Sequence, residues 1–288
     1  MYPSIRDDML RVFDSPQAGL QYLGLDAIEL EVSRDLEVFA LDAFTRVKLD
    51  DEASRAAYKA ALDSAGIRVA SLLTMCDFSG ETPESNVAWM TEVVEIADAL
   101  GANNVRVDTA MTEEQDLPFD VRVKVFVRDL GEVIRRTGGL DVALGMENHG
   151  FQGNNLAFLL NIIRDIDSER IGMTLDTGNF YWRGYPLSEV YGIIKILAPY
   201  AKHTHLKNIN YPAELRETTR ESGYEYMRYV STLEDGDIDH RVVVDLLRAA
   251  GYEGDLCIEN ESLENHETLE GKRGVLARDG AHVKALLA

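Results

Sequence analysis

Four short apolar runs in the second half of the chain each end in a side chain that can bind a divalent metal ion. These side chains are the carboxylates of Glu147, Asp176 and Glu259 and the imidazole of His205. Taken singly, each could instead cap a helix, close an Asx turn or be a hydrogen-bonded core histidine. Taken together, they indicate one site, because three carboxylates that meet without a cation repel one another and a bound metal ion removes that repulsion.

The donor atoms indicate which ion the site would take. Three carboxylates and one imidazole form an oxygen-rich set, which favours Mn²⁺, Mg²⁺ or Co²⁺, while Zn²⁺ is also compatible with it. Such a set leaves positions open in an octahedral ion, and two oxygens of a hydroxy-carbonyl substrate could occupy them. The residue types therefore predict a catalytic site with one divalent metal ion.

The elements that carry these residues repeat along the chain. Short β-rich runs alternate with amphipathic helical segments from about residue 27 onward, which is typical of parallel strands joined by crossover helices. Glycine follows three helical segments directly before a strand, which predicts left-handed caps at Gly66, Gly101 and Gly251. Seven strands are predicted at 27–32, 69–74, 104–109, 142–148, 171–177, 203–207 and 256–261.

About eight such units predict an α/β fold, a single-domain (β/α)₈ TIM barrel over residues 1–288. The first strand, at residues 2–6, is expected to be short or irregular, which leaves an open sheet as the competing architecture. In a barrel the carboxyl ends of all strands meet on one face, so the four ligand-type residues would converge there. The long stretch 208–237 between the last two strands is expected to be a lid or a substrate-contacting insert.

Composition limits the partners that the protein could have. The 288 residues carry 29 basic and 50 acidic side chains, a formal net charge of -21 that disfavours nucleic acid or an anionic membrane surface. The two cysteines, Cys76 and Cys257, lie in strand-like apolar runs and form no disulfide framework, which fits a reducing compartment. No signal peptide or spanning segment is recognisable, so a cytoplasmic location is expected.

Five segments in the second half resemble the strand-end motifs of xylose isomerase-like barrels. This family includes sugar phosphate isomerases and epimerases, ketose 3-epimerases, inosose dehydratases, hydroxypyruvate isomerases and endonuclease IV. In the first half the likeness extends only to the layout of strands and helices. The segments are 147–150 (ENHG), 175–179 (LDTGN), 205–208 (HLKN), 234–239 (EDGDID) and 258–260 (IEN).

The resemblance implies that Glu147, Asp176, His205 and Glu259 hold one metal ion. It also implies that Glu147 and Glu259 are catalytic, one removing a proton from a substrate carbon while the other returns it from the opposite face, with the metal stabilising the enediolate. Five further residues are predicted to contact substrate: His149, Lys207, Asn179, Arg106 and Trp182.

Two pairs on early strands have an alternative reading. Glu29 and Glu31 share one parity of their strand, and Arg106 and Asp108 share one parity of theirs, so each pair could face the pocket or form a buried salt-bridged layer.

The predicted function is a metal-dependent isomerase or epimerase of a sugar or related polyol, acting by proton transfer next to a carbonyl. A dehydratase or other lyase on a keto-sugar or inosose could use the same site. A metal-dependent phosphodiesterase is disfavoured by the negative charge and by the lack of histidines before His149. A sugar-binding barrel without activity and association into a homo-oligomer both stay open.

Two departures from the family motifs narrow the prediction. Many relatives have a histidine at the position of Asn179, which is a poor metal ligand but can donate a hydrogen bond. Ketose 3-epimerases carry a further glutamate shortly after the strand-five glutamate, and here residues 151–155 (FQGNN) contain none. Ketose 3-epimerisation is therefore disfavoured.

Overall fold

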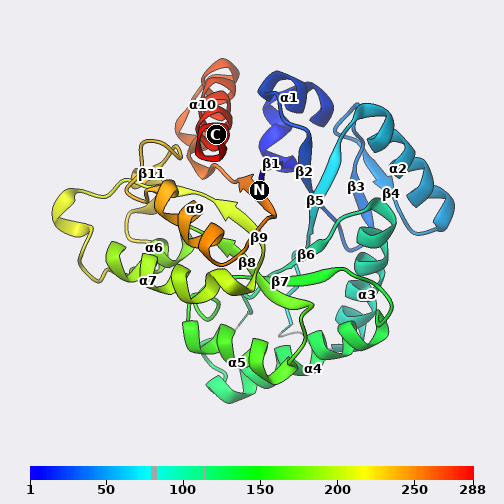
Figure 1. The fold of residues 1–288 in the computed structure, drawn as a ribbon, viewed down its shortest axis with the longest axis horizontal. Helices are drawn as coiled ribbons and strands as arrows, with labels where there is room; N and C mark the ends of the chain where they lie inside the picture. The colour runs from blue at the N-terminus through cyan, green and yellow to red at the C-terminus, as the bar shows by residue number, and fades with distance from the viewer. Residues whose placement is uncertain (79–82, 113) are drawn as a thin grey trace.

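Eight parallel strands close into a barrel in the order β1-β12-β9-β8-β7-β6-β5-β2 (Figure 1). The computed structural model describes residues 1–78, 83–112 and 114–288. Apart from one to three residues at their ends, the seven strands predicted from the sequence are confirmed. The barrel strands are β1 (Tyr2–Arg6), β2 (Ala27–Glu31), β5 (Arg68–Leu73), β6 (Asn104–Val107), β7 (Ala143–Glu147), β8 (Ile171–Asp176), β9 (Ala201–Leu206) and β12 (Asp255–Ile258).

The short first strand closes the barrel, so the open-sheet alternative is wrong. β1 pairs with β12 over four residues, from Tyr2 opposite Asp255 to Ile5 opposite Ile258, and with β2 at Ile5 opposite Ile28. The register of β2 against β5 shifts between Ile28 and Glu29. A shift of this kind changes the direction in which the next side chain points.

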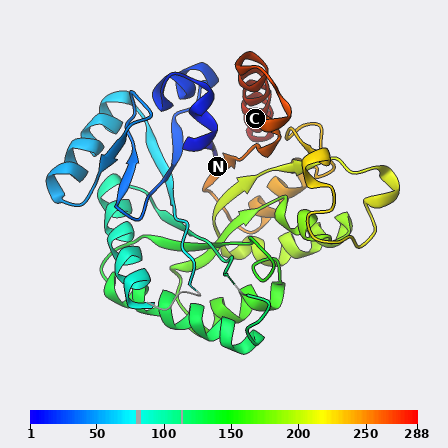
Figure 2. The same ribbon diagram turned by 180° about the vertical axis from the view of Figure 1, so that it is seen from behind.

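Helices surround the barrel in both views (Figures 1 and 2). The predicted left-handed caps are confirmed, since Gly66, Gly101 and Gly251 have φ of 68°, 79° and 81°. The α-helices are α1 (Pro16–Leu23), α2 (Glu52–Ala65), α3 (Pro83–Leu100), α4 (Phe119–Arg136), α5 (Leu156–Ile166), α6 (Asn179–Arg183), α7 (Leu187–Leu197), α8 (Tyr226–Tyr229), α9 (His240–Ala249) and α10 (Leu269–Leu287). The 3₁₀ helices are η1 (Asp7–Val12), η2 (Ala198–Tyr200), η3 (Ala213–Leu215) and η4 (Glu261–Asn265).

Two antiparallel hairpins are added to the barrel. One pairs β3 (Glu37–Phe39) with β4 (Arg46–Lys48) between β2 and α2. The other pairs β10 (Asn208–Ile209) with β11 (Val230–Ser231) at the base of the long stretch 208–237, which lies beside α6 and α7 at the left of Figure 1. This stretch is held to the barrel through Arg220, whose guanidinium donates to the carbonyls of Tyr181 and Tyr185.

Both cysteines are free thiols and buried. Cys257 lies in β12, but Cys76 follows β5 in an irregular segment, so the expectation that it sits in a strand is wrong. The apolar run simply continues past the last ladder hydrogen bond of β5. Among the described residues, no helix is both long and apolar enough to cross a membrane.

One buried carboxylate ties the first strand to the second. Asp7 is 2% exposed and accepts a hydrogen bond from the backbone N–H of Glu31 at 3.0 Å. Burial, reinforced by the neighbouring Asp8, raises the pKa of Asp7 to about 7, although the Glu31 N–H acts in the opposite direction. The charged form of Asp7 is therefore disfavoured in the folded protein.

Asp7→Asn should stabilise the protein, and the gain should depend on pH. Because the folded-state pKa lies above that of the unfolded chain, wild-type stability falls as pH rises from about 4 to about 7 and stays low above that range. The variant should be more stable by up to about 4 kcal/mol near pH 8 and equal to wild type near pH 4. Denaturant unfolding across pH measures this. Asp14→Asn, at an exposed aspartate nearby, is the control, and an equal gain at both pH values would contradict the interpretation.

Candidate metal centre

Four ligand-type side chains meet at the carboxyl ends of neighbouring strands. Glu147 ends β7, Asp176 ends β8, His205 lies near the end of β9, and Glu259 directly follows β12. One ligand atom from each lies within 4.8 Å of the others, and all four residues are buried. In the barrel, β12, β9, β8 and β7 are consecutive neighbours, so residues up to 112 positions apart in the sequence form one cluster.

Local hydrogen bonds decide how Asp176 points. Its Oδ1 accepts from the backbone N–H groups of Gly178 and Asn179, both at 2.7 Å. These bonds form the Asx turn that was the alternative role of this residue. The side-chain amide of Asn148 holds the backbone of Asp176. Its Oδ1 accepts from the Asp176 N–H at 2.9 Å, and its Nδ2 donates to the Asp176 carbonyl at 3.0 Å. With Asp176 Oδ1 occupied in the turn, Asp176 Oδ2 is directed to the cluster.

Three cluster atoms lack a hydrogen bond among the described residues: Asp176 Oδ2, His205 Nδ1 and Glu259 Oε2. All three belong to the group of four, and His205 Nδ1 lies 3.3 Å from Glu259 Oε2 and 3.5 Å from Glu147 Oε2. Buried polar atoms are costly when they have no partner. An oxygen-rich set of donors that converges and lacks hydrogen bonds fits a divalent cation.

Protein cations also offset the carboxylates. Arg6 pairs with Glu259 and with Asp8 at 3.1 Å, and Arg106 pairs with Glu147 and with Asp108 at 3.2 Å.

Lys207 Nζ lies 3.2 Å from Asp176 Oδ2, 3.1 Å from Glu259 Oε2 and 2.7 Å from Glu261 Oε1. Three basic side chains therefore already relieve part of the repulsion between the carboxylates, which the sequence predicted a metal ion would remove.

A family model of the xylose isomerase-like TIM barrel matches residues 19–279. The chain belongs to this family. A solved structure of the IOLI protein with a bound zinc atom superposes with a TM-score of 0.75 at 16% identity, covering 98% of each chain. The structure of an L-ribulose 3-epimerase superposes with a TM-score of 0.71 at 17% identity, covering 99% of this chain and 94% of the other. At these identities the superpositions establish the fold of this xylose isomerase-like barrel.

A curated relative is the uncharacterized protein MJ1311 of Methanocaldococcus jannaschii. It is 26% identical over 142 residues, which is 47% of this chain and 43% of the relative. The match thus spans less than half of either protein and does not indicate the activity of the whole protein.

Charge sets the protonation of the cluster in this xylose isomerase-like barrel. Burial alone would raise the pKa of Glu147, but Arg106 and His205 outweigh it and hold that pKa well below its usual range. Lys207, Arg6 and His205 do the same for Glu259 against its burial. The pKa of Asp176 is raised well above its usual range, by burial and by the two glutamates, although Lys207 opposes the shift.

The pKa of His205 is also raised well above its usual range, because Glu29, Glu259 and Glu147 outweigh its burial. Without a metal ion, Asp176 and His205 thus hold protons in conditions where the two glutamates are ionised.

The predicted substrate contacts occupy different positions. Asn179 donates to Glu147 Oε1 at 3.0 Å, and His149, partly exposed, is bonded through Nδ1 to Asp108 at 2.8 Å. Arg106 and Lys207 are buried in the ion pairs described above. Trp182 lies in α6, where its ring borders Gly223 of the long stretch. Contact of these residues with substrate stays a prediction.

Of the two pairs with an alternative reading, one forms the predicted buried salt bridge, Arg106 with Asp108. The other does not. Glu29 is buried against two histidines, whereas Glu31 is partly exposed and pairs with Arg46 at 3.5 Å. Glu31 is the last residue of β2, where its side chain reaches Arg46 of the β3–β4 hairpin, whereas Glu29 lies between the buried Ile28 and Leu30.

Arg6 was missed in the sequence. A signal for it exists, because Arg-x-Asp occurs at the carboxyl end of β1 as Arg6 and Asp8, and again at the end of β6 as Arg106 and Asp108. In both copies the arginine joins the aspartate to a cluster glutamate. The two ends of the cluster are therefore built in the same way.

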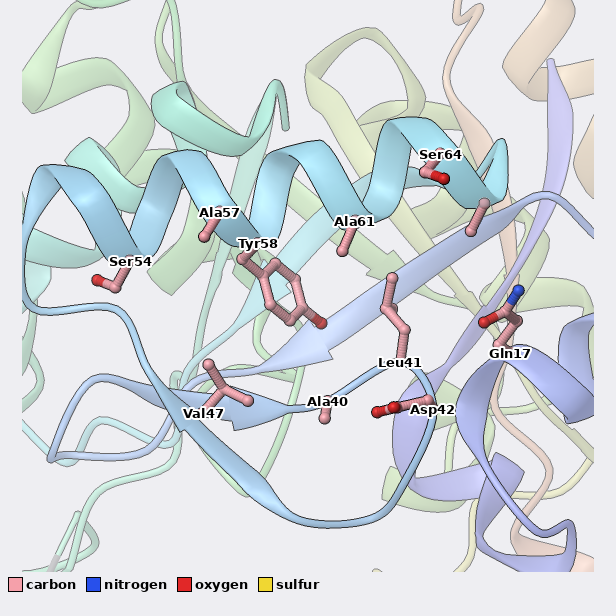
Figure 3. Close-up of a pocket in the computed structure, with 11 residues that line it drawn as sticks. Gln17, Ala40, Leu41, Asp42, Val47, Ser54, Ala57, Tyr58, Ala61 and Ser64 are labelled. Atoms are coloured by element: carbon pink, nitrogen blue, oxygen red, sulfur yellow. The ribbon is translucent and has the colours of Figure 1, made fainter.

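A separate pocket of about 630 Å³ lies outside the barrel, between α2 and the β3–β4 hairpin (Figure 3). Its lining is mainly apolar and small, and the hydroxyl of Tyr58 in its wall donates to the carbonyl of Phe39 at 2.7 Å. None of the four cluster residues borders it. This pocket is therefore separate from the candidate metal cluster.

Metal affinity should rise with pH. Asp176 and His205 have raised pKa values in the metal-free protein, and both must lose protons to bind an ion. Calorimetric titration with Mn²⁺ in two buffers of different ionisation enthalpy should detect proton release. Affinity that is independent of pH, or an equal affinity in Asp176→Asn, would contradict the assignment of these ligands.

Proposed function

We propose that this protein is a divalent-metal-dependent isomerase or epimerase of a sugar or related polyol, acting by proton transfer next to a carbonyl. Glu147, Asp176, His205 and Glu259 would hold the ion. The observation that carries this proposal is the buried cluster itself, in which four ligand atoms lie within 4.8 Å of one another and three of them lack a hydrogen bond in the described part of the chain.

The two glutamates are suited to act on opposite faces of a substrate carbon. Glu147 belongs to β7 and Glu259 follows β12, the outer two of four neighbouring strands, so their carboxylates approach the cluster from opposite ends. Each is oriented by an arginine, Arg106 or Arg6, and Asn179 fixes the second oxygen of Glu147. Positioned carboxylates of this kind can accept or return a proton at carbon.

The lowered pKa values of the two glutamates have opposite effects on their role as bases. Their lowered pKa values keep both carboxylates ionised, as a base must be, but a low pKa also weakens the driving force for proton transfer. A bound divalent ion supplies the compensating chemistry, because it stabilises negative charge that develops on substrate oxygens.

Charge around the site favours an unphosphorylated substrate. Three cations lie beside the cluster, and each is already paired with two or three carboxylates: Arg6, Arg106 and Lys207.

A cavity of about 730 Å³ is lined by Asp8 and Glu261. Asp8 pairs with Arg6 and Glu261 pairs with Lys207, and both of these cations also pair with Glu259. The lining of this cavity carries four carboxylates and two basic groups, beside exposed Met227 and Leu269. The excess of carboxylates in the lining would repel the negative charge of a phosphate group.

Glu259→Gln and Glu147→Gln should each reduce solvent-hydrogen exchange into substrate, by roughly 10²- to 10⁴-fold, because each removes one proton acceptor without changing the shape of the side chain. The assay is deuterium incorporation from D₂O with Mn²⁺ present, across ketoses, aldoses, inososes and 3-keto-glycosides. Circular dichroism reports whether each variant folds.

Glu264→Gln is the matched control for Glu259→Gln, since Glu264 lies in the same segment and pairs only with Lys272 at 3.3 Å. It should exchange at the wild-type rate. Exchange that persists in both active-site variants would place the base elsewhere. Loss of water from substrate, seen as an unsaturated product, would make the protein a lyase with the same metal site.

A neutral sugar should bind more tightly than its phosphate ester. The expected ratio is about tenfold or more, corresponding to about 1.4 kcal/mol, because the carboxylates that line the cavity outnumber its basic groups. Competition between a substrate from the panel and its phosphorylated form measures the ratio. Preference for the phosphate would contradict this assignment but would leave the proton-transfer mechanism intact.

A further inference from the structure

A buried row of side chains lies directly beneath the metal cluster. Glu29 of β2 receives two imidazoles, with His205 Nε2 at 2.8 Å from Oε2 and His203 Nε2 at 2.9 Å from Oε1. His203 continues the row, since its Nδ1 lies 2.7 Å from Asp255 Oδ1. All four side chains are at most 3% exposed.

The contact with Glu29 decides which nitrogen of His205 faces the cluster. Glu29 is a carboxylate, so the Nε2 of His205 must carry the hydrogen of their hydrogen bond. In a neutral imidazole the lone pair then resides on Nδ1, which is the atom that faces Glu147 Oε2 and Glu259 Oε2. The reverse tautomer would present a hydrogen to the cation.

Glu29 is itself fixed from below. It lies between the buried Ile28 and Leu30 of β2, and His203 lies 2.9 Å from the carboxylate oxygen that His205 does not use. Asp255, which anchors His203, accepts from the hydroxyls of Ser4 and Tyr252. No basic side chain of Lys or Arg type forms an ion pair with Glu29 among the described residues, so its partners are the two histidines and the thiol of Cys257, whose Sγ lies 4.0 Å from Oε2.

We propose that Glu29 is a positioning residue for the metal centre: it holds His205 with hydrogen on Nε2 and so presents Nδ1 as the ligand, while His203 and Asp255 hold Glu29 in place. This inference rests on the proposed metal site. Strand β2, which carries none of the four proposed ligands, would thereby contribute to metal affinity through Glu29. Hydrogen bonds of this kind to a ligating histidine commonly contribute 10- to 100-fold to affinity.

Glu29→Gln is the direct test. Glutamine keeps the shape of the side chain, but its amide can donate to His205 Nε2 and so favour the tautomer with hydrogen on Nδ1. The affinity for Zn²⁺, measured by chelator competition on purified metal-free protein, should fall by about 10- to 100-fold. Glu31→Gln is the matched control on the same strand, where the glutamate is partly exposed and pairs with Arg46, and its affinity should equal that of wild type.

A second measurement needs no variant. In zinc-loaded wild-type protein with ¹⁵N-labelled histidine, His205 should show a coordinated Nδ1 and a protonated, slowly exchanging Nε2. Coordination through Nε2 would overturn the proposal, and so would unchanged affinity in Glu29→Gln. His203→Gln should lower affinity less than Glu29→Gln, because His203 acts on the ligand through its ion pair with Glu29.

The outcomes separate this inference from the proposed function. Lost affinity in Glu29→Gln with no activity on any sugar would support the positioning role and remove the function. Normal affinity in Glu29→Gln together with an inactive Glu259→Gln would do the reverse. Wild-type protein that binds neither Zn²⁺ nor Mn²⁺ would overturn both.

A second ion would also overturn the inference. Glu29, His203, His205 and Cys257 have ligand atoms within 4.8 Å of one another, so Glu29 could itself be a ligand. Two Co²⁺ per chain with a thiolate charge-transfer band, lost in Cys257→Ser but kept in Cys76→Ser, would show that arrangement. One Co²⁺ without the band supports the positioning role.

Discussion

Balancing charge inside a closed barrel is the constraint on which the rest of this structure depends. Three carboxylates buried within a few ångströms of one another are strongly unfavourable unless positive charge lies among them. The chain supplies part of that charge with Arg6, Arg106 and Lys207, which alternate with the carboxylates around the cluster. Asp176 Oδ2 and Glu259 Oε2 lie near Lys207 but, like His205 Nδ1, have no hydrogen bond among the described residues, so these three atoms are the ones that a divalent ion would bind.

The buried charged side chains of the barrel form two layers. At the mouth, Glu147, Asp176, His205 and Glu259 face one another. Beneath them, Glu29 and His203 join strands on opposite sides of the closure point at β1, so the ligands above are held by the same contacts that help to close the barrel. Stability and function therefore share side chains here, and changes in the lower layer are expected to affect both.

The paired arginines have consequences for chemistry. They keep Glu147 and Glu259 ionised and oriented, but they also make both glutamates weaker bases than isolated buried carboxylates would be. A reaction at this site thus needs a substrate whose hydrogen is made acidic by an adjacent carbonyl and by nearby positive charge. That requirement fits isomerisation, epimerisation and elimination alike, and the fold is shared by enzymes of several such classes.

The elements and the four cluster residues could be read from the sequence because their signals are local. A strand, its glycine-capped helix and the polar residue that ends the strand lie within a few positions of one another, and parallel closure then brings all strand ends to one face. The same logic located Lys207 and Asn179, each within three residues of a cluster member.

The partners of these residues depended on the three-dimensional fold. Arg6 meets Glu259 across 253 positions and Glu29 meets His205 across 176, and strand parity indicates which side chains face inward but not which ones will touch. The register shift between β2 and β5, where Ala70 is the extra residue, leaves no local mark in the sequence. Local patterns specified where each strand ends, whereas barrel closure and register decided which charges are neighbours, because those contacts exist only once all eight strands are packed together.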